Sequence, residues 1–326
     1  RALTAAPPTH VATGDLDLAG MRVPLPLTDW ALPGATPLQV YTAHYLAWTD
    51  ELAAAIAADP NGPADAHLAA SLAGWHAEAR QHPKAWEPYV RSRRTLACLR
   101  AAARLPRHPL APTLLATAAA ACVGLDLLVE RHLGGNHLLV NRLALAAAAC
   151  AFGDAAQALA DLCRAWDAQF GQDGSHCEGS AMYHALLLED LLTVCALAPS
   201  AVAVHDQARR AAAWLAAVRH PDGHVPAFGD SDPACLTELP LVLAALADTQ
   251  AGATAPETSV WTARAKGGHF VVVHSAPMVC AAQPGHAHDD ALAVEWSHGG
   301  VRVLADAGLA GYDGDPNRAA NRSVKS

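Results

Sequence analysis

The feature that most constrains the fold is a long alanine-rich region, residues 38–220, in which apolar side chains recur at helical spacing. Breakers that contain glycine or proline interrupt this region at short intervals, and short connections favour antiparallel neighbouring helices. Helices paired in this way form either one stacked layer or a double ring, and periodicity alone does not choose between them. The predicted helices cover residues 39–58, 64–81, 88–104, 110–132, 137–152, 154–170, 178–197 and 201–219.

The character of the sequence changes after Pro221. Runs of β-branched and aromatic residues predict strands, and Gly299-Gly300 predicts a two-residue hairpin turn. We therefore expect an irregular lead-in over 1–37, a helical domain over 38–250, and from 258 the beginning of an antiparallel sheet. That sheet has too few strands here to close a sandwich, so we expect the protein to continue beyond Ser326. The predicted strands are 269–274, 279–282, 291–296 and 301–304.

Composition excludes several classes of protein. With 52% hydrophobic and 16% charged residues among 326, the chain is globular rather than disordered. A net charge of −9 argues against non-specific binding of nucleic acid, which needs a basic surface. No stretch is long and apolar enough to predict a membrane span. The eight cysteines contain no Cys-x-x-Cys pair, so we expect free, buried thiols and no disulfide framework.

Three short segments concentrate groups that can move protons: 135–137, 182–184 and 285–288. They supply the amide of Asn136, the phenol of Tyr183 and several imidazoles. These groups suit removal of a proton beside a carboxylate better than nucleophilic attack, which points to a lyase acting on acidic sugars. Each segment also has a plainer interpretation, as a helix cap, a packed aromatic side chain or loop histidines with ordinary hydrogen bonds.

A metal site is a further possibility. His286 and His288 alternate by two, so on an extended segment they share one face, and Asp306 is a candidate third ligand. A regular hairpin through Gly299-Gly300 pairs Asp306 near Ala293, so only a bend before the strand brings it to His288. The alternative is that both histidines make ordinary loop contacts.

The motifs, taken in order, resemble those of the heparinase II/III-like polysaccharide lyases, a family that includes heparin, heparan sulfate and alginate lyases. The resemblance extends from about Trp30 to the end of the chain. It implies an incomplete (α/α) toroid followed by the start of an antiparallel β-sandwich. The motifs that carry it are Trp86-Glu87-Pro88-Tyr89 with Ser92 and Arg94, Gly135-Asn136-His137-Leu138, Asp173-Gly174, Glu178-x-Ser180-x-x-Tyr183-His184, His220-Pro221-Asp222-Gly223, Gly285-His286-x-His288-x-Asp290, Asp306-x-Gly308, and Arg318 with Arg322-Ser323.

The family resemblance also implies roles for individual residues. Asn136 and His137 would neutralise the carboxylate of a uronic acid, and Tyr183 and His286 would serve as acid and base in β-elimination. The resemblance implies a structural zinc held by His288 and Asp306, with a further histidine expected just after Ser326. It also implies an acidic polysaccharide substrate and a periplasmic or secreted protein, and leaves the oligomeric state open. The residues we expect to contact substrate are Trp86, Tyr89, Arg94, Glu178 and His184.

Two other functions stay open at this point. A glycoside hydrolase needs two carboxylates that face the scissile bond, and the best pair here is Glu178 with Asp230 or Asp232. A carbohydrate-binding protein without activity needs none of the proton-transfer groups. An unsaturated product would separate a lyase from both.

Overall fold

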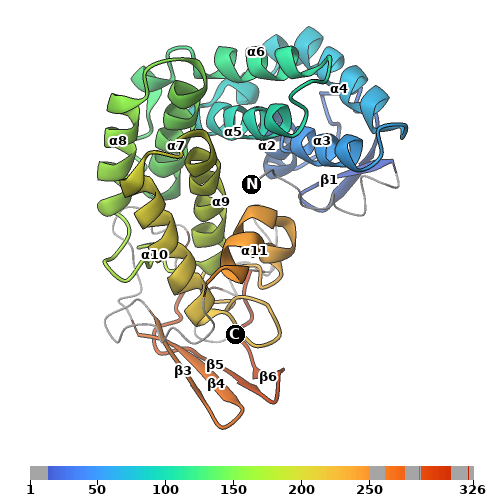
Figure 1. Cartoon of the computed structure of the whole chain (residues 1–326). Coiled ribbons are helices and arrows are strands. Elements are labelled where there is room, and N and C mark those ends of the chain that lie inside the picture. The colour runs from blue at the N-terminus through green and yellow to red at the C-terminus, as the bar shows by residue number, and fades with distance from the viewer. Residues whose placement is uncertain (1–13, 250–260, 276–285, 287, 310–321, 323–326) are drawn as a thin grey trace. The chain divides into compact units, whose positions relative to one another are not determined.

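The computed structural model describes residues 14–249, 261–275, 286, 288–309 and 322 (Figure 1). After a short N-terminal hairpin, helices precede the antiparallel strands of residues 261–304 along the chain, in the order that the sequence predicted for residues 38–326. Two compact units are present: unit 1 comprises Arg1–Glu130 and Val140–Ala158, and unit 2 comprises Arg131–Leu139 and Leu159–Ser326. This division falls inside the helical region. The domain boundary predicted near 250–258 lies almost wholly outside the described residues, so it stays a prediction.

The described part of unit 1 begins with a hairpin, within the region where the sequence predicted an irregular lead-in. Strands β1 (Asp15–Leu18) and β2 (Met21–Pro24) pair antiparallel around a two-residue turn with positive φ at Ala19 and Gly20. Leu16 and Leu18 alternate with polar residues and are buried, which explains the strand. An alanine in the left-handed region is uncommon, so the sequence did not indicate this turn.

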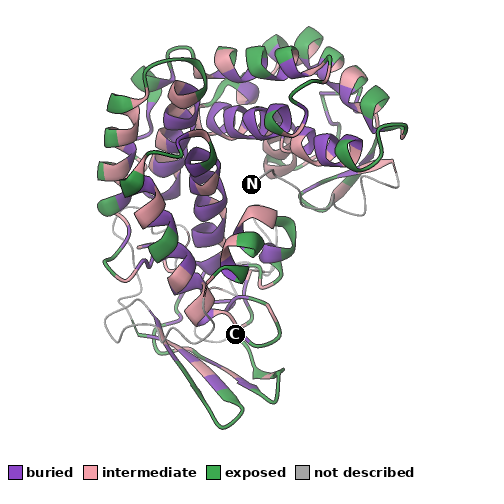
Figure 2. Ribbon diagram, viewed as in Figure 1, coloured by how far each residue is buried: buried purple, intermediate pink, exposed green. Residues whose placement is uncertain are grey.

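The helices of unit 1 are packed around α5, which is buried along most of its length and contacts α2, α3 and α6 (Figure 2). The predicted helix 39–58 is two helices, because Leu46 adopts a left-handed conformation with φ 55°. Thr36 and Gln39 form a capping box at the start of the first of them. The bounds are α2 (Pro37–Tyr45), α3 (Trp48–Ala58), α4 (Ala64–Glu78), α5 (Pro88–Arg104) and α6 (Ala111–Cys122), with short 3-10 turns at Ala79–Gln81, Pro83–Trp86 and Leu125–Leu128.

Two helices run from one unit into the other, α7 (Gly135–Phe152) and α8 (Ala156–Asp167). Within unit 2, α9 (Ala181–Leu197) is the most buried helix and contacts α10 (Val202–Val218) and α11 (Pro240–Ala247). A 3-10 turn at Cys235–Glu238 precedes α11. The sequence predicted neither of these two elements. None of the helices that the structure describes is long and apolar enough to cross a membrane.

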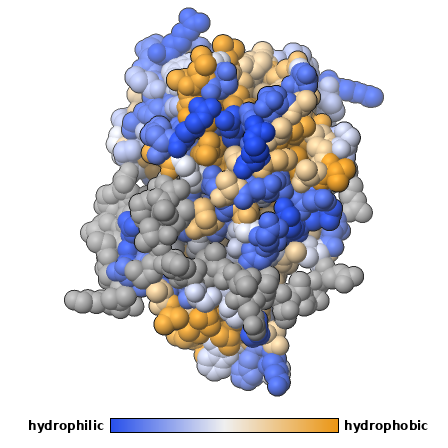
Figure 3. Space-filling view, turned by 90° about the vertical axis from the view of Figure 1, so that its left-hand side faces the viewer, coloured by the Kyte–Doolittle hydropathy of each residue, from blue (hydrophilic) through white to orange (hydrophobic). Residues whose placement is uncertain are grey.

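The strands that the structure describes in unit 2 form one antiparallel sheet in the order β3 (Trp261–Lys266), β4 (His269–His274), β5 (Val294–His298) and β6 (Val301–Leu304). Gly299 and Gly300 form the predicted hairpin turn, both with positive φ. The indole of Trp261 in β3 lies 5.2 Å from that of Trp214 in α10, so this end of the sheet packs against a helix. Figure 3 shows a surface on which hydrophilic and hydrophobic side chains are intermixed. An apolar area lies over the strands at the lower end of this view.

Candidate active site

Unit 2 brings Tyr183 and His286 together, although they are far apart in the sequence. Their rings are stacked, with centroids 4.2 Å apart and an interplanar angle of 11°. Tyr183 lies in the first turn of α9 and is almost fully buried, whereas 15% of the His286 side chain is exposed. A phenol and an imidazole are both able to donate and accept protons, so the pair has the groups that acid–base chemistry needs.

The N-terminus of α9 and a loop over residues 225–231 fix this pair. Ser180 is the N-cap of α9, and its Oγ accepts a hydrogen bond from the Tyr183 backbone N–H at 3.2 Å. The same hydroxyl donates to the Asp230 carbonyl at 2.7 Å. The Asp230 backbone N–H in turn donates to the carbonyl of His286 at 3.2 Å. A single loop is therefore bonded to the helix end that carries Tyr183 and to the backbone of His286.

Glu178 connects His286 to the start of α7. Its side chain has no exposed surface; Oε2 lies 2.9 Å from Nδ1 of His286, and Oε1 accepts the Asn136 backbone N–H at 2.6 Å. Burial by itself raises the pKa of this carboxyl group, but the hydrogen bonds from His286 and from the Asn136 backbone N–H favour the ionised form, and the pKa lies below its ordinary value. Glu178 is therefore a buried, ionised carboxylate.

Asn136 follows Gly134 and Gly135, which both have positive φ and allow the chain to turn into α7. Its side chain is buried, and Oδ1 has no hydrogen-bond partner among the described residues. A buried polar atom left in this way costs free energy unless a ligand group satisfies it. The next residue, His137, is half-buried.

Two of the residues predicted to contact substrate are buried inside unit 2. His184 has no exposed surface, donates from Nε2 to the Ala211 carbonyl at 3.0 Å, and packs against Trp214. Burial lowers the pKa of its imidazole to about 3, so it is neutral. Glu178 has both oxygens hydrogen-bonded as described above. In this structure neither side chain reaches solvent, and the contact of each with sugar stays a prediction.

The other three predicted substrate residues belong to unit 1. The fully buried Arg94 donates from Nη1 to the carbonyls of His44 and Ala85, at 3.1 and 2.8 Å. Its guanidinium lies 5.3 Å from the ring of Trp86, and burial lowers its pKa to about 10. Tyr89 is half-buried, and Trp86 is 39% exposed. Of these three, Trp86 is the side chain with most surface available to a sugar. The guanidinium of Arg94 lies over the ring of Trp86.

The predicted metal ligands are also in unit 2. Nε2 of His288 lies 2.8 Å from Oδ1 of Asp230, and its buried Nδ1 has no partner among the described residues. Asp306 is half-buried and accepts the Gly308 N–H at 2.9 Å. Burial raises the pKa of Asp306, as do the charges of Asp290 and Glu295. Histidines that bind metal ions typically have one ring nitrogen hydrogen-bonded to a carboxylate and coordinate the metal through the other.

No group of three histidine, cysteine or carboxylate side chains in the described part of the chain is arranged to hold a metal ion. The fit to zinc is therefore limited to His288 and Asp306. Zinc stays a prediction, and no chemical step is derived from it. The cysteines that the structure describes are free thiols; three are buried as the sequence predicted, Cys98, Cys195 and Cys235, and four are only half-buried, Cys122, Cys150, Cys163 and Cys177.

The residues that hold the 225–231 loop are not evident from the sequence. Glu295 is fully buried, accepts the Ala227 backbone N–H at 2.9 Å, and lies 3.0 Å from both His220 and Arg302. Asp290 accepts the Gly229 N–H at 2.8 Å. The motifs contained His220 and Asp290, but their spacing does not reveal that each supports the same loop.

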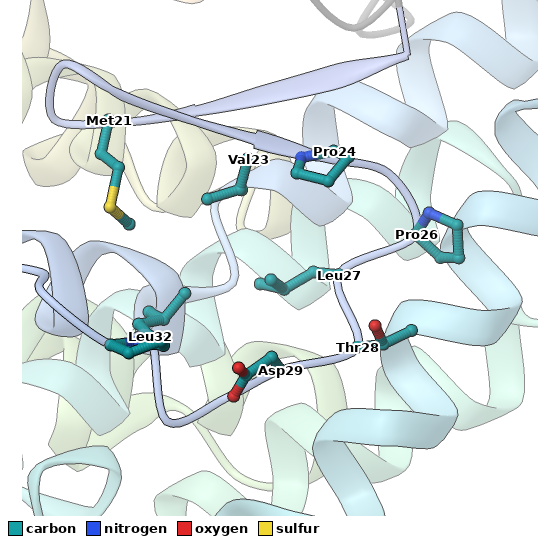
Figure 4. A pocket seen from close by; sticks show the side chains of 9 residues that line it. Met21, Val23, Pro24, Pro26, Leu27, Thr28, Asp29 and Leu32 are labelled. Atoms are coloured by element: carbon teal, nitrogen blue, oxygen red, sulfur yellow. The ribbon is translucent and has the colours of Figure 1, made fainter.

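A surface pocket of about 190 Å³ lies elsewhere, in unit 1 beside the β1–β2 hairpin (Figure 4). Met21, Val23, Leu27 and Leu32 are among its lining residues, and Asp29 is the one ionisable side chain among them. None of the predicted site residues lines it. This pocket therefore lacks the phenol and imidazole that the predicted proton transfers use.

Comparisons with known proteins agree with the motifs. Residues 248–326 match the family described as Heparinase II/III-like, C-terminal. A search of curated proteins finds no match. Among solved structures, heparan sulfate lyase HepC from Pedobacter heparinus is similar, with a TM-score of 0.56, 16% identity, and coverage of 96% of this chain and 57% of that one. Heparinase III is also similar, with a TM-score of 0.63, 17% identity, and coverage of 90% and 55%.

These likenesses confirm the resemblance and the fold class predicted from the sequence, helices followed by antiparallel strands as in the heparinase II/III-like lyases. This chain spans little more than half the length of the solved structures it matches. At such low identity the likeness shows the fold and not the activity.

Proposed function

We propose that the protein is a polysaccharide lyase that cleaves a uronic-acid-containing polysaccharide by β-elimination. The observation that supports this most is the stacked pair of Tyr183 and His286, bonded through Glu178 to the helix start that carries Asn136. The family match over the strands and the fold of heparan sulfate lyases support the same reading.

In this reaction a base removes the proton on the carbon beside the uronate carboxylate. The electron pair of that C–H bond forms a C=C bond, the bond to the glycosidic oxygen breaks, and an acid protonates the leaving oxygen. The proton is weakly acidic, because the neighbouring carboxylate already carries a negative charge. Asn136 and His137 would donate hydrogen bonds to that carboxylate, each lowering the barrier by about 3–4 kcal/mol if well placed.

Tyr183 and His286 would divide the two proton transfers. Acid–base help of this kind accelerates a reaction by about 10²–10⁴-fold. The stacking supports this assignment, because the phenol and the imidazole lie beside one another at the N-terminal end of α9. The buried carboxylates do not favour the hydrolase alternative: Glu178 and Asp230 each lie within hydrogen-bonding distance of a histidine, so neither is free to attack or protonate a sugar.

The proposal extends to other predicted residues. Trp86 would stack on a sugar ring of the acidic polysaccharide, since its indole is the exposed member of the predicted set. His288 and Asp306 would hold a structural zinc together with a further ligand. A polymer substrate of this kind implies a periplasmic or secreted protein.

The test is an absorbance assay for the new C=C bond, with heparan sulfate, alginate and other uronate polymers. We expect Tyr183→Phe to abolish the rise in ultraviolet absorbance, because the variant keeps the ring and loses the proton-transferring hydroxyl. Tyr45→Phe, in α2 of unit 1, is the matched control and should keep wild-type activity. Near-normal activity of Tyr183→Phe would remove Tyr183 from the mechanism. Cleavage without an unsaturated product would identify a hydrolase, and binding without turnover an inactive binding protein.

A further inference from the structure

We propose that Glu178 is a positioning residue that fixes the tautomer of His286, so that Nδ1 carries the proton and Nε2 keeps the lone pair that accepts one. This inference deepens the proposed function, on which its catalytic consequence rests. The tautomer itself is a property of the folded protein and can be measured without any substrate.

The geometry of the carboxylate carries the argument. Each oxygen of Glu178 has one close contact: Oε1 with the Asn136 backbone N–H at 2.6 Å, and Oε2 with Nδ1 of His286 at 2.9 Å. The side chain has no exposed surface, so water does not compete for either oxygen. A backbone N–H is always a donor, and an ionised carboxylate is only an acceptor. Nδ1 must therefore donate, and in the neutral ring Nε2 is left as the acceptor.

The surroundings of the pair support this assignment. The lowered pKa of Glu178 keeps the carboxylate ionised, so it has no proton to give to Nδ1. The nearby imidazole of His176 is fully buried, and burial lowers its pKa to about 4, so it adds no positive charge near neutral pH. The stacked ring of Tyr183 and the hydrogen bond from Asp230 N–H to the His286 carbonyl restrict the ring and its backbone.

The substitution Glu178→Gln separates a positioning role from a merely structural one. Glutamine has the same shape but offers one acceptor oxygen and one donor amide. The Asn136 N–H can only donate, so it takes the oxygen, and the amide N–H₂ then faces Nδ1 of His286. The imidazole can adapt to this donor by moving its proton to Nε2. We therefore expect the variant to fold and to hold His286 in the opposite tautomer, with no lone pair on Nε2.

The direct readout is ¹⁵N NMR of histidine-labelled protein at mildly alkaline pH, where imidazoles are neutral. The chain has 18 histidines, and the His286 signals are identified by their loss in His286→Gln. We expect the wild type to carry its proton on Nδ1 and Glu178→Gln to carry it on Nε2. The inference is overturned if the wild type is protonated on Nε2, or if the variant keeps the wild-type tautomer.

Activity gives a second readout that a structural role would not produce. Glu178→Asp keeps an acceptor-only carboxylate but shortens the side chain, whereas Glu178→Gln keeps the shape and loses the acceptor. A structural role predicts that glutamine is the milder change. The positioning role predicts the reverse order, with kcat lowered on the order of 10²–10⁴-fold in Glu178→Gln. A glutamine variant more active than the aspartate variant would contradict the proposal.

Glu189→Gln is the matched control. Glu189 is another buried glutamate of unit 2, and it accepts the backbone N–H of Val242 at 2.9 Å. We expect Glu189→Gln to leave kcat unchanged. The two proposals fail separately: a wild type without lyase activity removes the proposed function, while the NMR measurement still decides the role of Glu178.

Discussion

Lowering the pH should destabilise the protein through His184, a buried histidine that is held neutral. Its ring is fully buried, lies 4.6 Å from that of Trp214 and 5.3 Å from that of Phe170, and donates to the Ala211 carbonyl. Burial lowers its pKa from 6.5 to about 3. The unfolded chain therefore binds a proton at a higher pH than the folded protein does. The contribution of the neutral His184 to the free energy of unfolding is fully present above about pH 6.5. It is lost as the pH falls from there toward 3.

The size of the effect follows from the width of this interval. Two pH units below 6.5, at about pH 4.5, the unfolded state gains about 3 kcal/mol from protonation of His184. His176, whose pKa burial lowers to about 4, adds about 2–3 kcal/mol at the same pH. Together they approach the lower end of the stability of an ordinary domain, about 5 kcal/mol. The protein should therefore be close to unfolding at pH 4.5.

The assay is unfolding by urea at pH 7 and pH 4.5, followed by the fluorescence of the eight tryptophans. We expect His184→Gln, which keeps an amide donor for the Ala211 carbonyl, to lose about 2–3 kcal/mol less between the two pH values than the wild type. His224→Gln, at an exposed position of unit 2, should behave like the wild type. An equal loss in His184→Gln and the wild type would refute the reasoning, because it would mean that His184 is not held neutral by burial.

Three further substitutions test packing and charge burial in the fold. Gly174→Ala places a Cβ 2.3 Å from the backbone oxygen of Arg210 at a φ of +89°, so thermal unfolding should show a loss of about 3 kcal/mol or more. Gly20→Ala, with a φ of +84° and no atom within 4 Å, should cost only about 1–2 kcal/mol, and equal losses would contradict the steric explanation. Arg302→Met removes a partner 3.0 Å from the buried carboxylate of Glu295 and should destabilise by about 3 kcal/mol in urea; a change near zero would show that Glu295 is satisfied without it.

The sequence alone determined most of the helices and the turn between the last two strands. Helix α5 begins and ends where predicted, because Pro88 is favoured at the first helical position and the apolar spacing is regular. The turn at Gly299-Gly300 is also predictable from local sequence, because both residues have the positive φ that a two-residue hairpin turn requires and that glycine adopts readily. The break at Leu46 was missed, because a leucine with positive φ is imposed by packing and leaves no pattern in the sequence.

Only the tertiary structure decided which of the chemically suggestive residues meet. The sequence places Glu178 near Tyr183, but the helix begins after Ser180, so helical spacing does not relate the two. The structure instead joins Glu178 to His286, 108 residues away, and buries His184 from the same motif in the interior of unit 2. Helices and turns depend on neighbours within a few residues, whereas the partner of a buried carboxylate depends on how distant segments pack. For that reason the sequence predicted the chemical groups of the site, and the fold assigned each of them its contacts.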